Sequence, residues 1–209
     1  MDEIIKVNGI WVPADDTHID HWVSGAPFTQ NKCLSGFMDY CKQGGITFDT
    51  AVDIGAWCGT WSMAIQNICK KVIAFEPDPT HYKCLTKNVN KKIETHQLAV
   101  GSENKLIALS TDRHTQAKRV IGEGNIPMVT LDGLKITGVD LIKIDVEGFE
   151  MHVLEGAVDT IDNAKYIMIE LNNNTKKYGS SNGKIEEYLD KKGWKTLINL
   201  WPDKVFTKK

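Results

Sequence analysis

Arginine is scarce in this sequence, in which only Arg113 and Arg119 stand among 25 basic residues. Lysine carries the rest of the positive charge, and it lacks the planar fork with which arginine binds a phosphate through two hydrogen bonds. The formal net charge is −2, so no overall field favours nucleic acid or an anionic membrane. We therefore expect neither nucleic acid nor a membrane as a partner.

Paired cysteines are also missing. The five cysteines form no C-x-x-C pair and no zinc-type spacing: Cys33, Cys41, Cys58, Cys69 and Cys84. We expect reduced thiols and a cytoplasmic protein, because disulfides persist mainly in oxidising compartments. Cys58 is either a reactive thiol or a small buried filler, and the second interpretation is favoured because free cysteine is usually buried.

Long hydrophobic runs are absent as well, and no stretch approaches the roughly 20 apolar residues of a membrane-spanning helix. The first residues include Asp2 and Glu3, which differ from the basic start of a signal peptide. A content of 42% hydrophobic residues over 209 residues is enough for the core of one domain.

The N-terminal region predicts a small hairpin followed by a helix. Ile4–Val7 and Ile10–Val12 flank Asn8-Gly9, a turn pair that tolerates positive φ. His18 and His21 then lie near several acids, which fits either a metal site or a solvated capping segment. The capping segment is favoured, because no third ligand follows at a characteristic spacing.

The most informative stretch begins as a buried strand, Thr50–Ile54, and continues into a turn that contains Gly55 and Gly59. This pattern predicts a strand, a tight turn and a helix N-terminus that accept a nucleotide-type ligand. A second apolar run ends at Glu76, the spacing at which an acid binds both hydroxyls of a ribose. Trp57 stands where a dinucleotide site needs a small residue, so a ligand with a ribose and no phosphate fits better.

Two motifs carry a family resemblance. The pattern D-x-G-A-x-x-G followed by F-E-P-D-P resembles the S-adenosylmethionine (SAM) site of class I methyltransferases. The run Leu141–Glu150, with K-I-D-V-E-G-x-E, resembles the signature of the FkbM methyltransferase family. Together with Thr130–Asp132 and Val153–Ala157, the resemblance covers most of residues 50–172. One departure is Trp57, since the family usually has Asn there.

The resemblance implies an α/β fold: a three-layer αβα sandwich with a seven-stranded, mostly parallel sheet whose last strand is antiparallel. Residues 1–45 would add the hairpin and helix to the same domain, and 46–209 would form the SAM-binding part. The implied cofactor is SAM. The implied cofactor-binding residues are Asp53, Gly55, Ala56, Trp57, Gly59, Glu76, Pro77, Leu98, Ala99 and Asp145.

The implied reaction is methylation of a hydroxyl on a small molecule, with a sugar or glycan as the expected acceptor. Asp145 and Glu147 are the candidates for orienting or deprotonating that hydroxyl, and no resident metal is expected. One alternative is a magnesium-dependent O-methyltransferase that uses Asp145, Glu170 and Asn172. Another is a nucleotide-binding module without catalysis, or a dehydrogenase relative, which Trp57 disfavours because it opposes a pyrophosphate. The sequence gives no indication of oligomeric state.

Three further segments are expected to border the site. In related methyltransferases a helix such as the one expected over Asn31–Lys42 lies across the cofactor mouth, so the resemblance implies that Phe28–Lys32 line the site, whereas the apolar stripe alone indicates only core. A third parallel strand is expected over Gln97–Val100, where the resemblance implies an apolar floor for adenine at Leu98 and Ala99, and plain core is the alternative. The polar segment Thr111–Asn125 is either a loop that faces the acceptor or a surface excursion.

Overall fold

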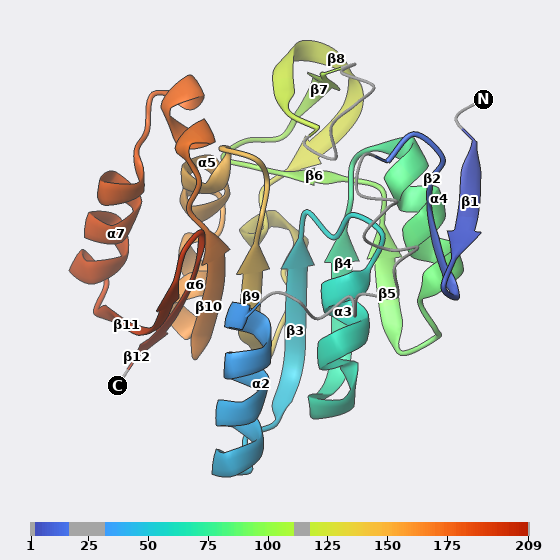
Figure 1. Ribbon diagram of the computed structural model, residues 1–209. Helices are drawn as coiled ribbons and strands as arrows, with labels where there is room; N and C mark the ends of the chain where they lie inside the picture. The colour runs from blue at the N-terminus through green and yellow to red at the C-terminus, as the bar shows by residue number, and fades with distance from the viewer. Residues whose placement is uncertain (1–2, 17–31, 111–117, 209) are drawn as a thin grey trace.

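The computed structural model describes residues 3–16, 32–110 and 118–208, and a seven-stranded sheet lies at its centre (Figure 1). Its strand order is β11-β12-β10-β9-β3-β4-β5, in which β12 runs antiparallel to the other six strands. The bounds are β3 Phe48–Ile54, β4 Cys69–Phe75, β5 Ile93–His96, β9 Val139–Ile144, β10 Tyr166–Glu170, β11 Trp194–Leu200 and β12 Asp203–Lys208. The predicted mostly parallel sheet with an antiparallel last strand is confirmed.

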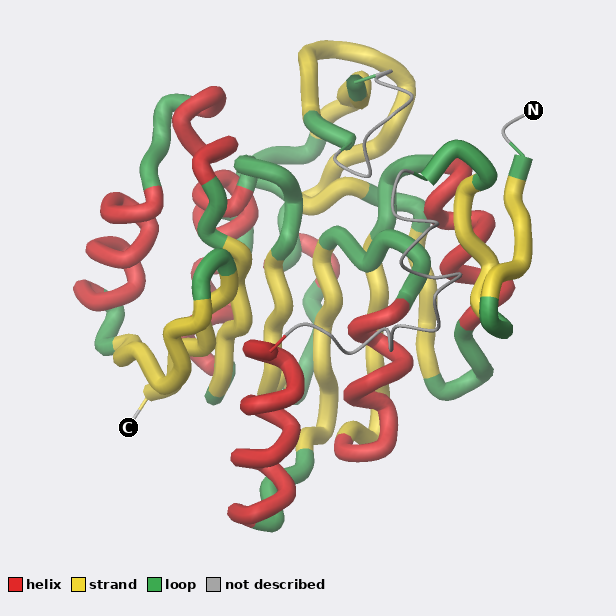
Figure 2. The backbone as a smooth tube through the Cα atoms, viewed as in Figure 1, coloured by secondary structure: helices red, strands yellow, loops and turns green. Residues whose placement is uncertain are grey.

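Helices cover both faces of this sheet, as the tube view shows (Figure 2). Successive residues of β3 alternate between two cores: Val52 and Ile54 pack with the helices of one face, and Ala51 packs with those of the other. The first face carries α5 Glu150–Glu155, α6 Val158–Asn163 and α7 Asn182–Lys191. The second carries α2 Lys32–Gly44, α3 Thr60–Ile65, the 3-10 turn η1 Gln66–Ile68 and α4 Pro79–Asn88. The predicted three layers are therefore present.

The N-terminal hairpin forms as predicted, from β1 Ile4–Val7 and β2 Ile10–Pro13. It packs against α4, where the Asn88 side chain accepts from the Trp11 N–H at 2.7 Å and donates to the Trp11 carbonyl at 2.8 Å. His18 and His21 lie outside the described residues. The division into 1–45 and 46–209 stays a prediction, although Phe37 of α2 is buried against Phe48 of β3.

The third parallel strand was predicted at Gln97–Val100, and this position is wrong. Strand β5 ends at His96 and pairs with β4, while β6 Ala99–Val100 joins a separate three-stranded sheet with β7 Lys105–Leu109 and β8 Val120–Val129. Because β5 is the edge strand, it tolerates polar Glu94 and His96. It therefore lacks the continuous apolar run by which a buried strand is recognised in sequence.

The predicted polar loop over Thr111–Asn125 is also corrected, because residues 120–125 belong to β8. The pairing of β7 with β8 is irregular between Ile107 and Leu109, opposite the segment that holds Gly122 and Gly124. Glycines occur at such bulges in strands, and the same residues are typical of loops, so this strand segment has the sequence pattern of a loop. Residues 111–117 lie outside the described residues.

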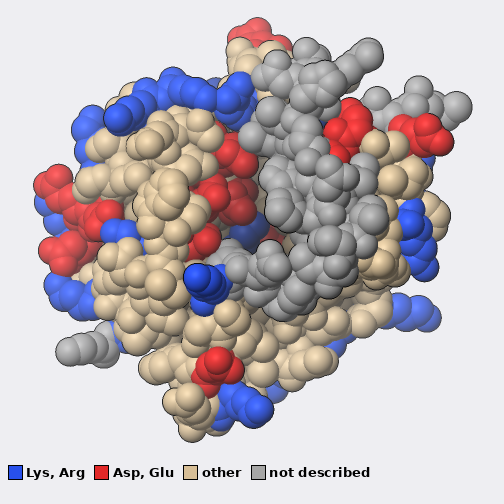
Figure 3. Space-filling view, in the orientation of Figure 1, with Lys and Arg blue, Asp and Glu red and all other residues tan. Residues whose placement is uncertain are grey.

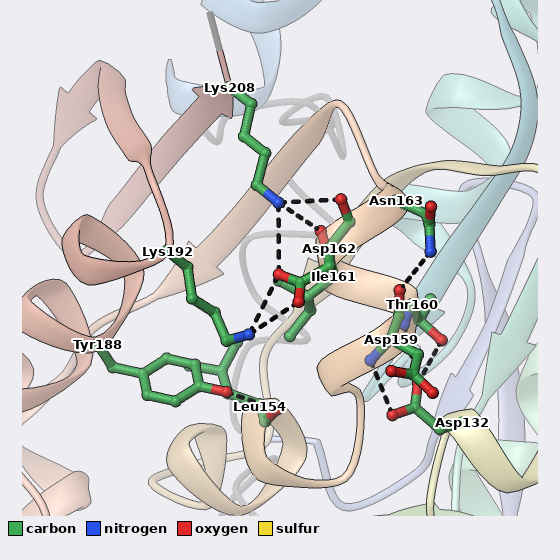
Figure 4. Close-up of polar contacts among 10 residues, drawn as sticks. All are labelled: Asp132, Leu154, Asp159, Thr160, Ile161, Asp162, Asn163, Tyr188, Lys192 and Lys208. Carbon is green, nitrogen blue, oxygen red and sulfur yellow. Dashed lines mark hydrogen bonds and ion pairs between the residues drawn. The ribbon is translucent and has the colours of Figure 1, made fainter.

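Helix α6 packs on the face of the sheet opposite α2, and Figure 4 shows the polar contacts at its two ends. Asp132, in the 3-10 turn η2 Asp132–Leu134, accepts from the backbone N–H groups of Asp159 and Thr160 at 3.0 and 2.9 Å. It therefore satisfies two donors at the start of α6, as an N-cap does, although it lies 27 residues earlier in the chain. Lys192 and Lys208 pair with Asp162 at the other end of α6. Among the described residues, no helix is both long and apolar enough to cross a bilayer.

Candidate functional site

A cavity of about 230 Å³ opens where β3, β4, β9 and β10 end, the edge of a parallel sheet at which ligands bind. In the space-filling view, acidic side chains gather along one side of a hollow near the centre, with a basic side chain within it (Figure 3). Most of the predicted site residues line this cavity: Gly55, Ala56, Trp57, Glu76, Pro77, Leu98, Ala99, Asp145 and Glu147. Asp53 and Gly59 are not among its lining residues.

Lining residues also come from the segments predicted to border the site. Leu98 and Ala99 line the cavity even though they do not extend the central sheet, so an apolar floor for adenine stays a prediction that the geometry allows. Lys118 and Val120 line it from the segment predicted to face the acceptor, and Leu34 lines it from α2. Of the predicted Phe28–Lys32 border, residues 28–31 lie outside the described residues.

The glycines of the turn make room for protein atoms. Gly55 has φ +77°, and a Cβ there would lie 1.8 Å from the carbonyl oxygen of Asp145. Gly59 has φ +86°, and its Cβ would lie 2.7 Å from Leu85 Cδ1 of α4. Glycine is therefore needed at both positions so that β3 approaches β9 and the turn approaches α4.

Glu76 is 5% exposed and follows directly on β4. Its two carboxylate oxygens accept from the backbone N–H groups of Trp57 at 2.8 Å and Asp78 at 2.9 Å. These bonds fix the carboxylate against the glycine turn at the cavity wall. Each carboxylate oxygen has a second lone pair, so the hydroxyls of a ribose can still be accepted.

His81, on α4, is a lining residue that sequence analysis did not single out for the site. Its Nδ1 lies 3.7 Å from Glu76 Oε1, and its ring meets that of Trp57 edge-on at 6.4 Å between centroids. Burial alone lowers the pKa of His81, but the nearby negative charges of Glu76 and Asp78 outweigh burial and raise it. Trp57 thus stands next to a histidine whose charged form is stabilised by Glu76 and Asp78.

Cys58 is fully buried, and burial raises the pKa of its thiol far above the ordinary value. A buried thiol with a raised pKa forms little thiolate. The structure therefore favours the interpretation of Cys58 as a small filler.

Lys143 is a second residue that sequence analysis passed over, although it is the lysine of the K-I-D-V-E-G motif. Its ammonium donates to the Gly55 carbonyl at 2.6 Å and lies 3.3 Å from Asp53 Oδ1 and 3.4 Å from Asp145 Oδ2. Asp53, which is fully buried, also accepts from the Ser62 hydroxyl at 2.6 Å. Asp53 therefore lies below the cavity floor. The sequence does contain a signal for this role, namely a lysine inside an apolar strand. A charged side chain can be buried in a strand only when another charge or a hydrogen-bond partner pairs with it.

Three carboxylates meet at one side of the cavity. One oxygen each of Asp145, Glu147 and Glu170 lies within 4.8 Å of the others. Burial, and then the charges of Asp145 and Glu147, raise the pKa of Glu170 to about 9. Burial and the charge of Asp145 also raise the pKa of Glu147. Such a cluster binds a proton or a cation more readily than isolated carboxylates do.

Two asparagines hold this cluster in place. At the start of the 3-10 helix η3 Asn173–Tyr178, the side-chain oxygen of Asn172 accepts from the backbone N–H of Asn174 at 2.8 Å. The NH₂ group of the same Asn172 side chain donates to Glu170 at 2.7 Å. Asn174 donates to Glu147 at 3.0 Å. Glu147 itself has φ +57°, a left-handed conformation that costs a non-glycine residue energy and persists where the surroundings enforce it. Backbone strain and a side-chain network thus converge on Glu147.

Comparison with known proteins agrees with this arrangement. The model of the methyltransferase FkbM domain matches residues 45–195. The hexuronic acid methyltransferase AglP of Haloferax volcanii is 25% identical over 134 residues, which are 59% of this chain and 56% of that protein. The chain thus spans little more than half the length of this curated relative.

Solved structures show the fold. The precorrin-6y C5,15-methyltransferase from Geobacter metallireducens matches with a TM-score of 0.50 and 14% identity, over 87% of this chain and 90% of that one. A protein of the NADB-Rossmann superfamily from Streptococcus agalactiae matches with a TM-score of 0.50 and 13% identity, over 85% and 68%. The family match covers well over half of the chain and includes the turn, both motifs and the acidic cluster. The chain therefore belongs to the FkbM family of methyltransferases.

Proposed function

We propose that this methyltransferase uses SAM and transfers the methyl group to a hydroxyl of a sugar or other small metabolite. The observation that carries the proposal is that Glu76, the glycine turn and the carboxylates of Asp145 and Glu147 all border one cavity. Two kinds of group, one suited to a ribose and one suited to a reacting hydroxyl, thus face the same space.

The residues present fit SAM. Glu76 offers a fixed carboxylate for a ribose, and Leu98 and Ala99 offer an apolar surface for a base. Asp145 and its neighbours offer negative charge suited to a cationic ligand. When bound, SAM supplies a methyl group already activated by its sulfonium, so the protein has mainly to align the acceptor and exclude water.

Glu147 is the proposed proton acceptor for the hydroxyl. Its raised pKa brings it closer to the operating pH of a general base, and Asn174 holds its carboxylate on the cavity side. Asp145, whose side chain is 37% exposed, is placed to orient the acceptor. Like charges repel, so the negative charge of this acidic cluster favours a neutral hydroxyl over an anionic acceptor.

The sugar class draws support from the relative in Haloferax volcanii, whose name gives a hexuronic acid as its substrate. A hexuronic acid offers hydroxyls as well as a carboxylate. For this chain, we propose methylation at a hydroxyl, because the carboxylate would approach the acidic cluster.

Metal assistance is the second candidate, favoured by the approach of Asp145, Glu147 and Glu170 within 4.8 Å. Carboxylate oxygens suit magnesium. This set of ligands differs from the expected one of Asp145, Glu170 and Asn172. Glu147 supplies the third acid, whereas Asn172 donates its NH₂ group to Glu170. In this candidate, the cation would orient the hydroxyl and lower its pKa.

Two measurements test these proposals. Calorimetry with SAM, with its demethylated product and with NAD should show binding of the first two alone, whereas failure to bind either would overturn SAM dependence. A methyl-transfer assay on neutral sugars and hexuronic acids, with and without chelator, should give a methyl ether at full activity in chelator. Loss of activity that magnesium restores favours metal assistance, and SAM binding without transfer to any acceptor favours a binding module.

A further inference from the structure

Lys143 is the one described lysine that lines the cavity with its ammonium in contact with two acids of the sheet, and no role follows for it from the proposed reaction. Its side chain is 11% exposed. Strands β3 and β9 are neighbours, and their register sets Lys143 opposite Asp53. Burying an ammonium between two strand ends costs free energy unless opposite charges and hydrogen-bond acceptors are fixed around it. The groups that contact Lys143 are therefore the groups whose positions it can fix.

The ammonium has three polar neighbours. It donates to the Gly55 carbonyl at 2.6 Å and forms ion pairs with Asp53 at 3.3 Å and with Asp145 at 3.4 Å. An ammonium can donate hydrogen bonds but cannot accept them. The surrounding carboxylates, Asp53 first, outweigh burial and raise the pKa of Lys143 above its ordinary value. Lys143 is therefore unsuited to act as a base toward a ligand.

Two of the three partners are themselves cavity walls. Gly55 and Asp145 line the cavity from the glycine turn and from the end of β9, while Asp53 is fully buried beneath them. The ammonium thus joins a buried acid to two half-buried residues that line the cavity. Two carboxylates and one ammonium leave a net negative charge, the sign that suits the sulfonium and amino groups of SAM.

We propose that Lys143 is a positioning residue for the cofactor: it fixes the Gly55 carbonyl and the Asp145 carboxylate at the cavity floor in the arrangement that binds the cationic part of SAM. The inference rests on the proposed use of SAM and adds how the site recognises it. Without the ammonium, Asp145 loses its anchor and Asp53 and Asp145 repel each other across the floor.

The first test separates positioning from stability. Lys143→Met keeps a long side chain and removes the charge, but it leaves Asp53 buried without a counter-charge and is expected to destabilise the fold. The double variant Lys143→Met/Asp53→Asn removes both buried charges and should recover most of the stability. The matched control is Lys192→Met, which breaks the ion pair with Asp162 outside the cavity lining.

The expected result is that the double variant unfolds near the parent temperature but binds the demethylated cofactor about tenfold or more weakly, the loss expected when hydrogen bonds of charged groups are removed. Lys192→Met should keep the parent affinity. Affinity within about twofold of the parent in a folded double variant would overturn the inference and leave the proposed function intact. No binding by the parent protein would overturn the proposed function and the inference with it.

A second measurement needs no variant. In the parent protein, the ¹H–¹⁵N signal of the Lys143 ammonium, assigned through its own side chain, should shift on saturation with the demethylated cofactor, because two of its partners contact the ligand. The signal of Lys192 should stay in place. An unshifted Lys143 signal at saturation would count against a positioning role, whether or not the double variant folds.

Discussion

Replacing Gly55 by alanine tests the close approach on which the cavity floor depends. The added Cβ would lie 1.8 Å from the Asp145 carbonyl oxygen and 2.9 Å from its carbonyl carbon. Both are backbone atoms of the neighbouring strand end, so neither can move aside as a flexible side chain can. We expect β3 and β9 to separate locally, which would displace Asp145 and weaken cofactor binding.

The magnitude has two parts. A residue with a Cβ at φ +77° costs roughly 1–2 kcal/mol in the left-handed region. Overpacking adds typically about 1–3 kcal/mol, and the rigid backbone partner places this case at the upper end. The expected loss is therefore about 3–5 kcal/mol, a large part of the roughly 5–15 kcal/mol that stabilises a domain.

Gly45→Ala is the matched control. Gly45 also has positive φ, at +61°, but its Cβ would meet no atom within 4 Å, so only the conformational cost of about 1–2 kcal/mol applies. Urea unfolding followed by circular dichroism gives both losses, provided that the slope m stays at the parent value. If the two variants lose equal stability, the contact between Gly55 and Asp145 has no energetic weight and the reasoning is refuted.

Three other predictions follow from contacts described above. Glu150 is fully buried, and burial raises its pKa to about 7. Between its ordinary pKa of 4.5 and about 7, the folded state keeps a proton that the unfolded state has released. Glu150 should therefore lower the free energy of unfolding by about 3 kcal/mol as the pH rises from 4.5 to 7. Glu150→Gln should make the loss of stability between pH 4 and pH 8 about 3 kcal/mol smaller in urea unfolding, while Glu147 and Glu170, whose pKa values are also raised, keep their own contributions. An unchanged pH dependence would contradict the assignment. Asp132→Ala should cost about 1–2 kcal/mol by uncapping α6, measured as a lower unfolding midpoint with unchanged SAM affinity, and a change below 0.3 kcal/mol would argue against capping. Glu76→Gln should weaken SAM binding by about 1.5–3 kcal/mol in calorimetry, because an amide replaces a charged acceptor, and equal affinity would remove Glu76 from the ribose site.

The sequence by itself determined the elements that local pattern encodes. Asn8-Gly9 specified the first hairpin, since both turn residues adopt positive φ, at 47° and 88°. The apolar runs that became β3, β9 and β10 are buried on both faces, and such runs remain visible without any knowledge of neighbours. The motifs then identified the family, and with it the mostly parallel sheet with an antiparallel last strand.

Other features were decided only by tertiary structure, because they depend on what lies opposite a residue. The edge position of β5 allowed polar Glu94 and His96, so the strand had no apolar pattern to detect. Gly55 was expected to admit a ligand, yet the nearest obstacle to a side chain there is the Asp145 carbonyl, 90 positions further along the chain. Contacts between such distant residues follow from sheet register, which no local pattern records.

The candidate site shows the same division. Asp145 and Glu147 were found from a motif, and Glu170 was expected beside Asp145 in the magnesium-dependent alternative. The pairing of Lys143 and the raised pKa of Glu170 required the folded chain. A pKa shift arises from burial and from charges within a few ångströms, and both are properties of the assembled strand ends. Sequence thus supplied the reactive groups, and the parallel alignment of β3, β9 and β10 gave them their shared environment.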